Sequence, residues 1–214
     1  PRGNPSPKLA ITVDPEVHEE ILAAVARDGV SVSAWMTAAA REALRRRAGL
    51  AAVEEWEKQH GRFTEEEMRE ARRNVRAQLR ASGKGGAGMS AVVYDAAILV
   101  AADRNDRRAW AEHKARLELG LIPLVPAPVV AQVSRSTQQA QLRRFLSGCS
   151  VVPLGESEAH EAGRLLGIAR TSDVVDAVVA TTAVRRKATI LTGDAKDMER
   201  LVRASGGNAA VVAV

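Results

Sequence analysis

The chain has 214 residues, enough for one or two domains, and its 46% apolar content with scattered charge excludes a disordered protein. The single cysteine, Cys149, excludes an internal disulfide and favours a reducing cytoplasm. No apolar run reaches the roughly eighteen residues of a membrane span, and the first residues do not resemble a signal peptide. The net charge of +5 permits a nucleic-acid partner without requiring one.

A short strand followed by two helices is predicted near the N-terminal end. Apolar and polar side chains alternate over residues 8–13, as in a strand with one buried face. Asp14 and Pro15 then have the residue types of an N-cap and a first helical position, and Gly29 is typical of a helix end. Because a lone strand has no pairing partner in so short a segment, we expect two chains to pair antiparallel in a symmetric dimer.

The order and spacing of these elements resemble the ribbon-helix-helix family of DNA-binding proteins over about residues 7–48. In that family the outward side chains of the strand read the major groove, and the amides that open the second helix hold a phosphate. The resemblance implies a domain at residues 1–48 that binds operator DNA as a dimer. The matching positions are Lys8, Ala10, Thr12, Ser31 and Ser33. A plainer interpretation, in which Lys8 and Thr12 are only solvated, stays open.

Residues 49–81 are predicted to form a charged helical tail that is interrupted near Gly61. Thr64 and Glu67 have the spacing of a capping box, and the apolar stripe that follows them is thin. A helix this polar is not stable alone, so it is either a solvated spacer or a segment that folds onto a partner surface. In the second case four arginines would approach a cluster of carboxylates: Arg69, Arg72, Arg73 and Arg76.

Residues 82–90 are rich in glycine, which predicts a flexible linker. Met89, at the end of this linker, resembles the first residue of a second reading frame. The chain therefore has the organisation of two proteins joined in one, and the sequence leaves open whether the fusion is natural or engineered.

Residues 91–214 alternate between short apolar runs and helical segments. This alternation predicts an α/β fold with a five-stranded parallel sheet and helices on both faces. The predicted strands are 91–95, 121–125, 151–154, 189–192 and 210–214. His113 and His160 lie in charged helical segments, and we expect both at the surface.

Four aspartates are predicted to meet at one edge of this sheet. Asp95 and Asp194 follow the first and fourth strands, and the carboxyl ends of parallel strands share an edge where ligands bind. Asp173 and Asp176 are three residues apart in the first turn of a helix, so they share a face. Converging carboxylates repel one another unless a cation lies between them, and oxygen ligands suit Mg²⁺ or Mn²⁺. Alternatively, Asp95, Asp173 and Asp194 only cap helices.

Three runs carry a second resemblance: Val92 to Asp95, Asp173 to Ala177, and Ile190 to Asp197. Together they resemble the PIN-domain ribonucleases over nearly all of residues 91–214. With the N-terminal half, the chain is similar to a VapBC type II toxin–antitoxin pair in which a VapB-like antitoxin is joined to a VapC-like toxin. The resemblance implies a Mg²⁺-dependent endoribonuclease whose antitoxin blocks the active site and represses its own operon.

The positions of this family's site fall on the same aspartates. The resemblance implies that Asp95 and Asp176 are the main metal ligands and that Asp194, with Thr192, is the fourth acidic position, while Asp173 is an extra carboxylate. The family usually has a glutamate where this chain has Gln132, which brings a carbonyl oxygen but no charge. Metal affinity and turnover therefore depend on whether Asp173 supplies the missing negative charge.

The function expected from these observations is a cytoplasmic RNA-cleaving toxin, without a membrane partner, that the tail keeps inactive. The tail would cover the nuclease site of its own chain or of a neighbouring chain in a homodimer or higher oligomer. The main alternative is a DNA-binding repressor whose PIN domain is catalytically dead and serves only for interaction. A different Mg²⁺-dependent phosphotransfer enzyme is less well supported, because the sequence has no P-loop motif.

Overall fold

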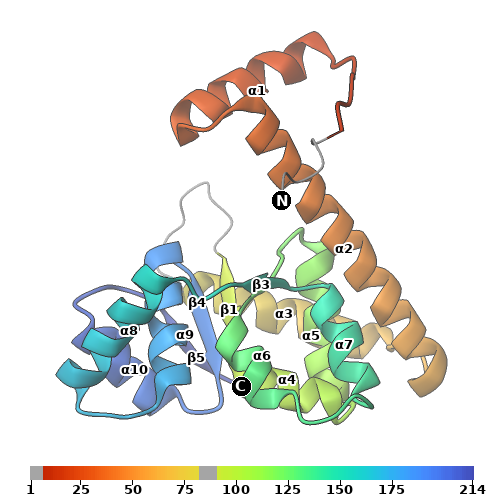
Figure 1. Ribbon diagram of the computed structural model, residues 1–214. Helices are drawn as coiled ribbons and strands as arrows, with labels where there is room; N and C mark the ends of the chain where they lie inside the picture. The colour runs from red at the N-terminus through yellow and green to blue at the C-terminus, as the bar shows by residue number, and fades with distance from the viewer. Residues whose placement is uncertain (1–6, 82–90) are drawn as a thin grey trace. The chain divides into compact units, whose positions relative to one another are not determined.

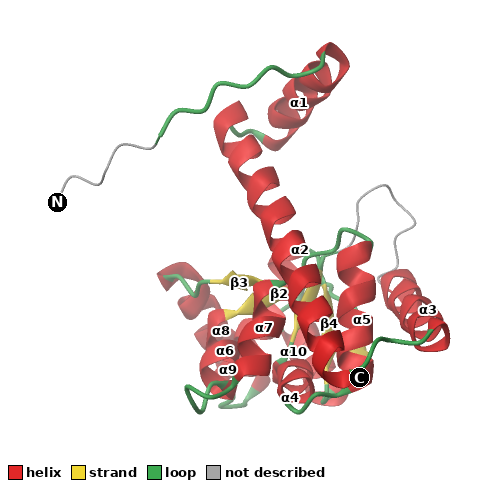
Figure 2. Cartoon of the chain, turned by 90° about the vertical axis from the view of Figure 1, so that its right-hand side faces the viewer, coloured by secondary structure: helices red, strands yellow, loops and turns green. Residues whose placement is uncertain are grey.

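The computed structural model describes residues 7–81 and 91–214, so the predicted linker 82–90 lies outside the described residues. The chain divides into two compact units, Pro1–Ala43 and Leu44–Val214. Helix α2, Val32–His60, is one continuous helix that contributes to both units (Figure 2). The domain boundary predicted after residue 48 therefore falls inside a helix.

The first unit contains helix α1, Pro15–Asp28, and the beginning of α2. The predicted helix signals are confirmed. The Asp14 side chain accepts a hydrogen bond from the Glu16 amide at 3.1 Å, and Gly29 ends the helix in the left-handed region with a φ of 66°. The Ser31 hydroxyl accepts a hydrogen bond from the Ala34 amide at 3.2 Å, which caps α2.

The strand predicted over residues 8–13 is not present in the single chain, where residues 7–14 form no regular element. The physical reason is that a strand needs hydrogen bonds from a neighbour, and one chain does not supply that neighbour here. Leu9 and Ile11, on the face predicted to be buried, are 86% and 55% exposed. The pairing of two chains stays a prediction.

The second unit is built on a five-stranded parallel sheet with helices on both faces, as predicted (Figure 1). Its strand order is β3-β2-β1-β4-β5, so the first strand lies at the centre and adjoins the fourth. The strands are β1 Val92–Tyr94, β2 Leu124–Pro126, β3 Ser150–Val152, β4 Thr189–Thr192 and β5 Val211–Ala213. The connecting helices are α4 Ala96–Asp103, α5 Arg107–Glu118, α6 Ala127–Val133, α7 Ala140–Ser147, α8 Glu156–Ala169, α9 Val174–Arg186 and α10 Ala195–Ala204.

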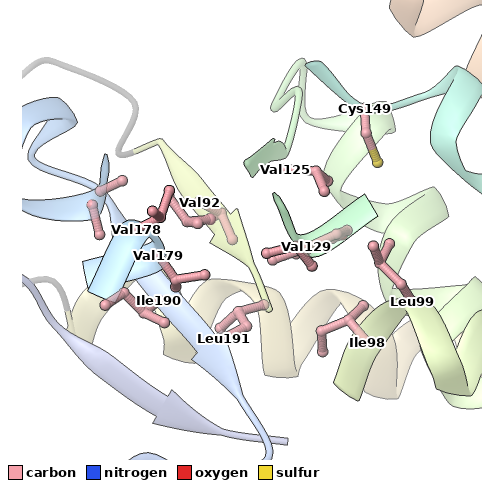
Figure 3. Packing of buried hydrophobic residues seen from close by; sticks show 14 of the residues in the cluster. Val92, Ile98, Leu99, Val125, Val129, Cys149, Val178, Val179, Ile190 and Leu191 are labelled. Atoms are coloured by element: carbon pink, nitrogen blue, oxygen red, sulfur yellow. The ribbon is translucent and has the colours of Figure 1, made fainter. Parts of the chain in front are cut away.

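The core of this unit is mostly aliphatic, because the central strands are buried and are rich in valine, isoleucine and leucine (Figure 3). The second part of α2 belongs to the same core. Trp56 is fully buried, its indole N–H donates to the Asn105 side chain at 3.0 Å, and its ring stacks on Trp110 with centroids 5.3 Å apart. Residues 44–60 therefore belong to the second compact unit.

Helix α3, Glu65–Ala81, also packs on this unit. The predicted capping box is present: the Thr64 amide donates to the Glu67 carboxylate at 2.7 Å, and the Glu67 amide donates to the Thr64 hydroxyl at 3.2 Å. The predicted apolar stripe, with Met68, Ala71 and Val75 all buried, packs against α5. Because the stripe has a partner surface within the same chain, α3 is not a solvated spacer.

His113 lies in the interior, so the prediction that it lies at the surface is wrong. Its ring is fully buried, and its Nδ1 lies 3.2 Å from the Tyr94 hydroxyl. Burial, followed by the nearby positive charge of Arg116, lowers the pKa of His113 to about 3. His160 is exposed, as expected.

Of the helices that the structure describes, none has the length and apolar character needed to cross a membrane.

Candidate active site

Asp95 occupies the position at the carboxyl end of β1 where the sequence places a ligand-binding carboxylate. It follows the strand directly and is the N-cap of α4, where its Oδ1 accepts a hydrogen bond from the Ala96 amide at 2.6 Å. Its Oδ2 accepts a hydrogen bond from the Thr192 hydroxyl at 2.7 Å, and the residue is only 8% exposed. The capping interpretation of Asp95 is thus correct, and the same bonds orient the carboxylate at the sheet edge.

Thr192 links the ends of two adjacent strands, because β1 and β4 are neighbours in the sheet. Its fully buried hydroxyl donates to Asp95 and accepts a hydrogen bond from the Asp194 amide at 3.0 Å. A side chain on Gly193 would place its Cβ 3.0 Å from the Ala97 Cβ, so glycine lets this turn lie close to α4. Asp95 and Asp194 are therefore positioned through a single hydroxyl group.

The two remaining predicted aspartates lie at the start of α9. Asp173 is its N-cap, and one oxygen accepts hydrogen bonds from the amides of Val175 and Asp176, both at 3.0 Å. Asp176 is half-buried in the first turn. Its position agrees with the predicted spacing, which places both carboxyl groups at the same helix end.

The pKa of Asp176 shows that the predicted aspartates come together. Burial, followed by the negative charges of Asp173, Asp95 and Asp194 in that order, raises this pKa to about 6. Each of these residues must lie close enough to act on Asp176 through the protein. The four carboxylates predicted from the sequence therefore form one electronegative cluster, at the end of β1 and β4 and the beginning of α9.

Asp197 also contributes to this cluster, although the sequence analysis does not single it out as a site residue. Its charge is among those that raise the pKa of Asp176, and its amide donates to the Asp194 carboxylate at 3.1 Å. A signal for it was available, because Asp194 and Asp197 have the same three-residue spacing at a helix start as Asp173 and Asp176.

Gln132 lies on α6, a helix that packs against both α4 and α9. Its side-chain oxygen is buried and has no hydrogen-bond partner among the described residues. A buried carbonyl oxygen without a donor is costly, and a cation or water would satisfy it. The Gln132 oxygen is therefore free to act as a neutral ligand, and this role stays a prediction.

The donor set suits a hard divalent cation, although no group of three or more His, Cys, Asp or Glu side chains within residues 7–81 and 91–214 is already arranged as a metal site. Part of this donor set is engaged in helix capping. Asp95, Asp173 and Asp194 each commit Oδ1 to a backbone amide. For Asp173 and Asp194 the second oxygen has no hydrogen bond within the described part of the chain, so it is available to a ligand.

The predicted DNA-binding residues lie in the first unit, whereas the aspartates lie in the second. All of them are exposed: Lys8, Ala10, Thr12, Ser31 and Ser33. Of the two serines, Ser31 provides the side-chain cap of α2, and the carbonyl of Ser33 accepts a hydrogen bond from the Thr37 hydroxyl at 2.7 Å. The Ala34 amide at this helix start is therefore already occupied, and phosphate binding by the amides here stays a prediction.

The arginines predicted to neutralise the site lie on α3 and do not pair with the aspartates in the described part of this chain. Arg72 forms an ion pair with Glu118 of α5 at 3.2 Å. Arg69, Arg73 and Arg76 are exposed and have no carboxylate within 4.0 Å among the residues that the structure describes. Their approach to the site of a second chain stays a prediction.

Comparison with known proteins identifies one family. Residues 92–203 match the family model described as the PIN domain. A chain in the solved structure of VapBC2 from Rickettsia felis, bound to a DNA fragment from its promoter, is similar over 58% of this chain and 98% of that chain, with 18% sequence identity and a TM-score of 0.46. No curated protein matches the chain.

Proposed function

This chain belongs to the PIN domain family, and from that premise we propose that its second unit is a metal-dependent endoribonuclease that hydrolyses RNA phosphodiester bonds. The observation that carries the proposal is the convergence of carboxylates at the edge of a parallel sheet, where the Thr192 hydroxyl joins Asp95 to the turn of Asp194 and four carboxylates help to raise the pKa of Asp176. So much negative charge in one partly buried place is stable only with a cation or a proton.

We infer that Asp95 and Asp176 hold a divalent ion, Mg²⁺ or Mn²⁺, with Asp194 contributing through water. Asp173 adds the negative charge that Gln132 lacks, and Gln132 contributes its buried carbonyl oxygen. When bound, such an ion activates a water molecule and stabilises the negative charge that develops at phosphorus.

The chain's own residues hold this site in position. The Thr192 hydroxyl donates a hydrogen bond that restrains the Asp95 carboxylate, and the hydrogen bond that it accepts from the Asp194 backbone amide fixes the turn after β4. The cap on α9 keeps Asp173 beside Asp176. A catalytic arrangement built on strand ends and helix starts is rigid, which favours correct placement of the scissile phosphate.

For the first unit we propose an antitoxin-like role, in which two chains pair their segments 8–13 and bind operator DNA. The support is physical: Leu9 and Ile11 are exposed in the single chain, and an antiparallel partner strand would cover that face. Lys8, Ala10 and Thr12 would then point toward the DNA, and the amides near Ser31 and Ser33 would hold a phosphate. This arrangement makes the protein a homodimer or a higher oligomer.

We propose further that the antitoxin half keeps the nuclease inactive in the assembled protein, which is the relation expected of a VapBC-type pair joined in one chain. No ion pair joins the arginines of α3 to the aspartates of their own chain in the described residues, so the proposal leaves the inhibitory contact to be made within one chain or between chains. Assembly through residues 8–13 would bring such chains together, and the linked halves would act at high effective concentration.

The test uses a protein of residues 44–214, which keeps Trp56 and α3 with the compact second unit. It is incubated with an end-labelled structured RNA and Mg²⁺ or Mn²⁺, with EDTA as the negative control. We expect metal-dependent cleavage, and we expect Asp95→Asn to lower the rate by about 100-fold or more, because a ligand to the ion loses its charge. Far-UV circular dichroism checks that the variant is folded.

Equal cleavage by Asp95→Asn would show that the activity comes from elsewhere. No cleavage by 44–214 with either metal would favour the second candidate function, a DNA-binding repressor with a catalytically dead PIN domain. The observation that favours this candidate is Gln132, a neutral residue at the position where the family usually has a glutamate. The site therefore has one carboxylate fewer than usual.

A further inference from the structure

A stripe of arginines runs along the exposed face of α3. One arginine follows another at nearly every turn, and the residues line one shallow cleft of about 380 Å³ together with Glu65. The members of this arginine stripe are Arg69, Arg72, Arg73, Arg76 and Arg80. Apart from the Arg72–Glu118 pair, the stripe has no ion pair within the part of the chain that the structure describes.

The stripe is held in place by contacts on other faces of α3. Met68, Ala71 and Val75 are buried against α5, and the capping box begins the helix. The Glu67 carboxylate accepts hydrogen bonds from the Arg107 guanidinium at 2.7 and 2.9 Å, which lowers the pKa of Glu67 to about 2. The arginines are therefore presented by an anchored helix, and little conformational freedom of the backbone is lost when a ligand binds.

Keeping these charges together costs stability in the isolated chain. Arginines four residues apart repel one another, as in the pairs Arg69 with Arg73 and Arg76 with Arg80, and each such pair destabilises a helix by a few tenths of a kcal/mol. Glu65 lines the same cleft, but no carboxylate lies within 4.0 Å of Arg69, Arg73 or Arg76 among the described residues, so no ion pair offsets this repulsion. An anionic ligand would remove the repulsion and gain charge-assisted hydrogen bonds.

The length of the stripe indicates which anion fits. From residue 69 to residue 80 the helix rises by about 16 Å, with one arginine for roughly each 5.4 Å turn. The aspartates of a second copy form a compact cluster that could meet only one end of this stripe. A nucleic-acid strand carries one phosphate per nucleotide and can follow the stripe over its whole length, and the arginine fork suits phosphate oxygens.

We propose that the arginine stripe of α3 binds the phosphodiester backbone of a nucleic acid, and that in the nuclease it serves as a track for the RNA strand outside the aspartate cluster. Only the choice of RNA as the source of the backbone rests on the proposed nuclease function. The stripe binds phosphates without reading sequence, because guanidinium groups that contact the backbone carry no base information.

The test measures binding by the full-length chain, in EDTA so that no cleavage occurs, with a fluorescein-labelled single-stranded RNA and separately with a double-stranded DNA. Fluorescence anisotropy gives the Kd between about 50 and 200 mM salt, a range over which phosphate contacts show a strong salt dependence. The stripe variant is Arg69→Gln, Arg73→Gln and Arg76→Gln together. The matched control replaces three exposed arginines elsewhere in the second unit: Arg164→Gln, Arg186→Gln and Arg203→Gln.

Each lost contact to a single strand lowers the slope of log K against log salt by about 0.7, so the stripe variant should lose about 2 in slope and at least about tenfold in affinity. The control variant should change the slope by less than about 0.5. Loss for RNA assigns the stripe to RNA, whereas loss for DNA alone supports phosphate binding but overturns its role as a track for the RNA strand.

Equal slopes for the stripe and control variants would overturn the proposal. Unchanged nucleic-acid binding accompanied by dissociation of the oligomer in sedimentation would also overturn it, because the stripe would then bind carboxylates of a second chain. The binding assay contains EDTA and does not depend on catalysis. A failure of RNA cleavage in the activity test would therefore not change the outcome of the binding test.

Discussion

Replacing Gly49 by alanine tests whether α2 packs against the nuclease-like unit as closely as the structure shows. Gly49 lies inside α2, and a Cβ on it would lie 2.5 Å from the Gly148 Cα and 2.7 Å from Leu117 Cδ1. The first of these neighbours is backbone, so it cannot move away by changing a rotamer. Either α2 or the turn at Gly148 must shift to accommodate a single methyl group.

The magnitude follows from two opposing effects. Alanine is favoured over glycine inside a helix by about 1 kcal/mol, whereas forcing an extra methyl group into a packed interface costs about 1 to 3 kcal/mol. With two contacts well below normal van der Waals distance, we expect the second effect to dominate and the free energy of unfolding to fall by about 1 to 2 kcal/mol.

Gly163→Ala is the matched control, because Gly163 also lies inside a helix, α8, and has no atom within 4 Å of the position of a Cβ. This change should raise the free energy of unfolding by about 0.5 to 1 kcal/mol. Urea unfolding of both variants, followed by far-UV circular dichroism, measures the difference. If Gly49→Ala stabilises the protein as much as Gly163→Ala does, the close contact between α2 and Gly148 is refuted.

Two further predictions concern buried rings. Trp56→Ala should lower the free energy of unfolding by about 3 to 5 kcal/mol, because Trp56 is fully buried. Trp35→Ala in the first unit should lower it by much less, because Trp35 is half-buried. Equal losses for the two variants would contradict the packing of α2. His113 has a folded-state pKa of about 3 against an ordinary value of 6.5, so the unfolded chain binds more protons between these values. The His113 contribution to stability should therefore be complete above pH 6.5 and decrease as the pH falls, by at most about 1.4 kcal/mol per unit. His113→Gln should remove this part of the slope in unfolding curves taken between about pH 6.5 and 5, and an unchanged slope would show that the ring is accessible to protons.

Local signals in the sequence were sufficient for most of the secondary structure. The helix starts at Asp14 and Ser31 and the capping box at Thr64 are formed by hydrogen bonds between residues two or three positions apart, so their residue types predict them directly. The strands at residues 92–94 and 189–192 are apolar runs buried on both faces. Both kinds of signal depend on neighbours in the chain and not on the fold.

The burial of His113 could have been anticipated in part. It lies three residues after Trp110 and four before Leu117, and both of these residues are fully buried on α5. The charged residues around His113 obscured this periodicity, because α5 also buries Glu112 and Arg116, which form an ion pair at 3.1 Å. A helix that pairs its charges internally can be buried on a face that looks polar.

The packing partners of residues 49–81 show where sequence reasoning ends. Trp56 belongs to the core because it meets Asn105 and Trp110, and α3 is anchored because Glu67 meets Arg107. These partners are far apart in the chain, and no local pattern encodes their contact. The strand at residues 8–13 has the opposite problem, since its pairing depends on a second chain.

By itself, the sequence determined that carboxylates follow the first and fourth strands and begin the helix before the fourth, because residue type and strand position are local properties. Only the tertiary structure decided that these carboxylates act on one another, because β1 and β4 become neighbours when the chain crosses over. It also decided that the Thr192 hydroxyl holds Asp95, and that the arginines of α3 lie on a helix packed against α5. Those facts depend on distances between elements, which the order of residues does not contain.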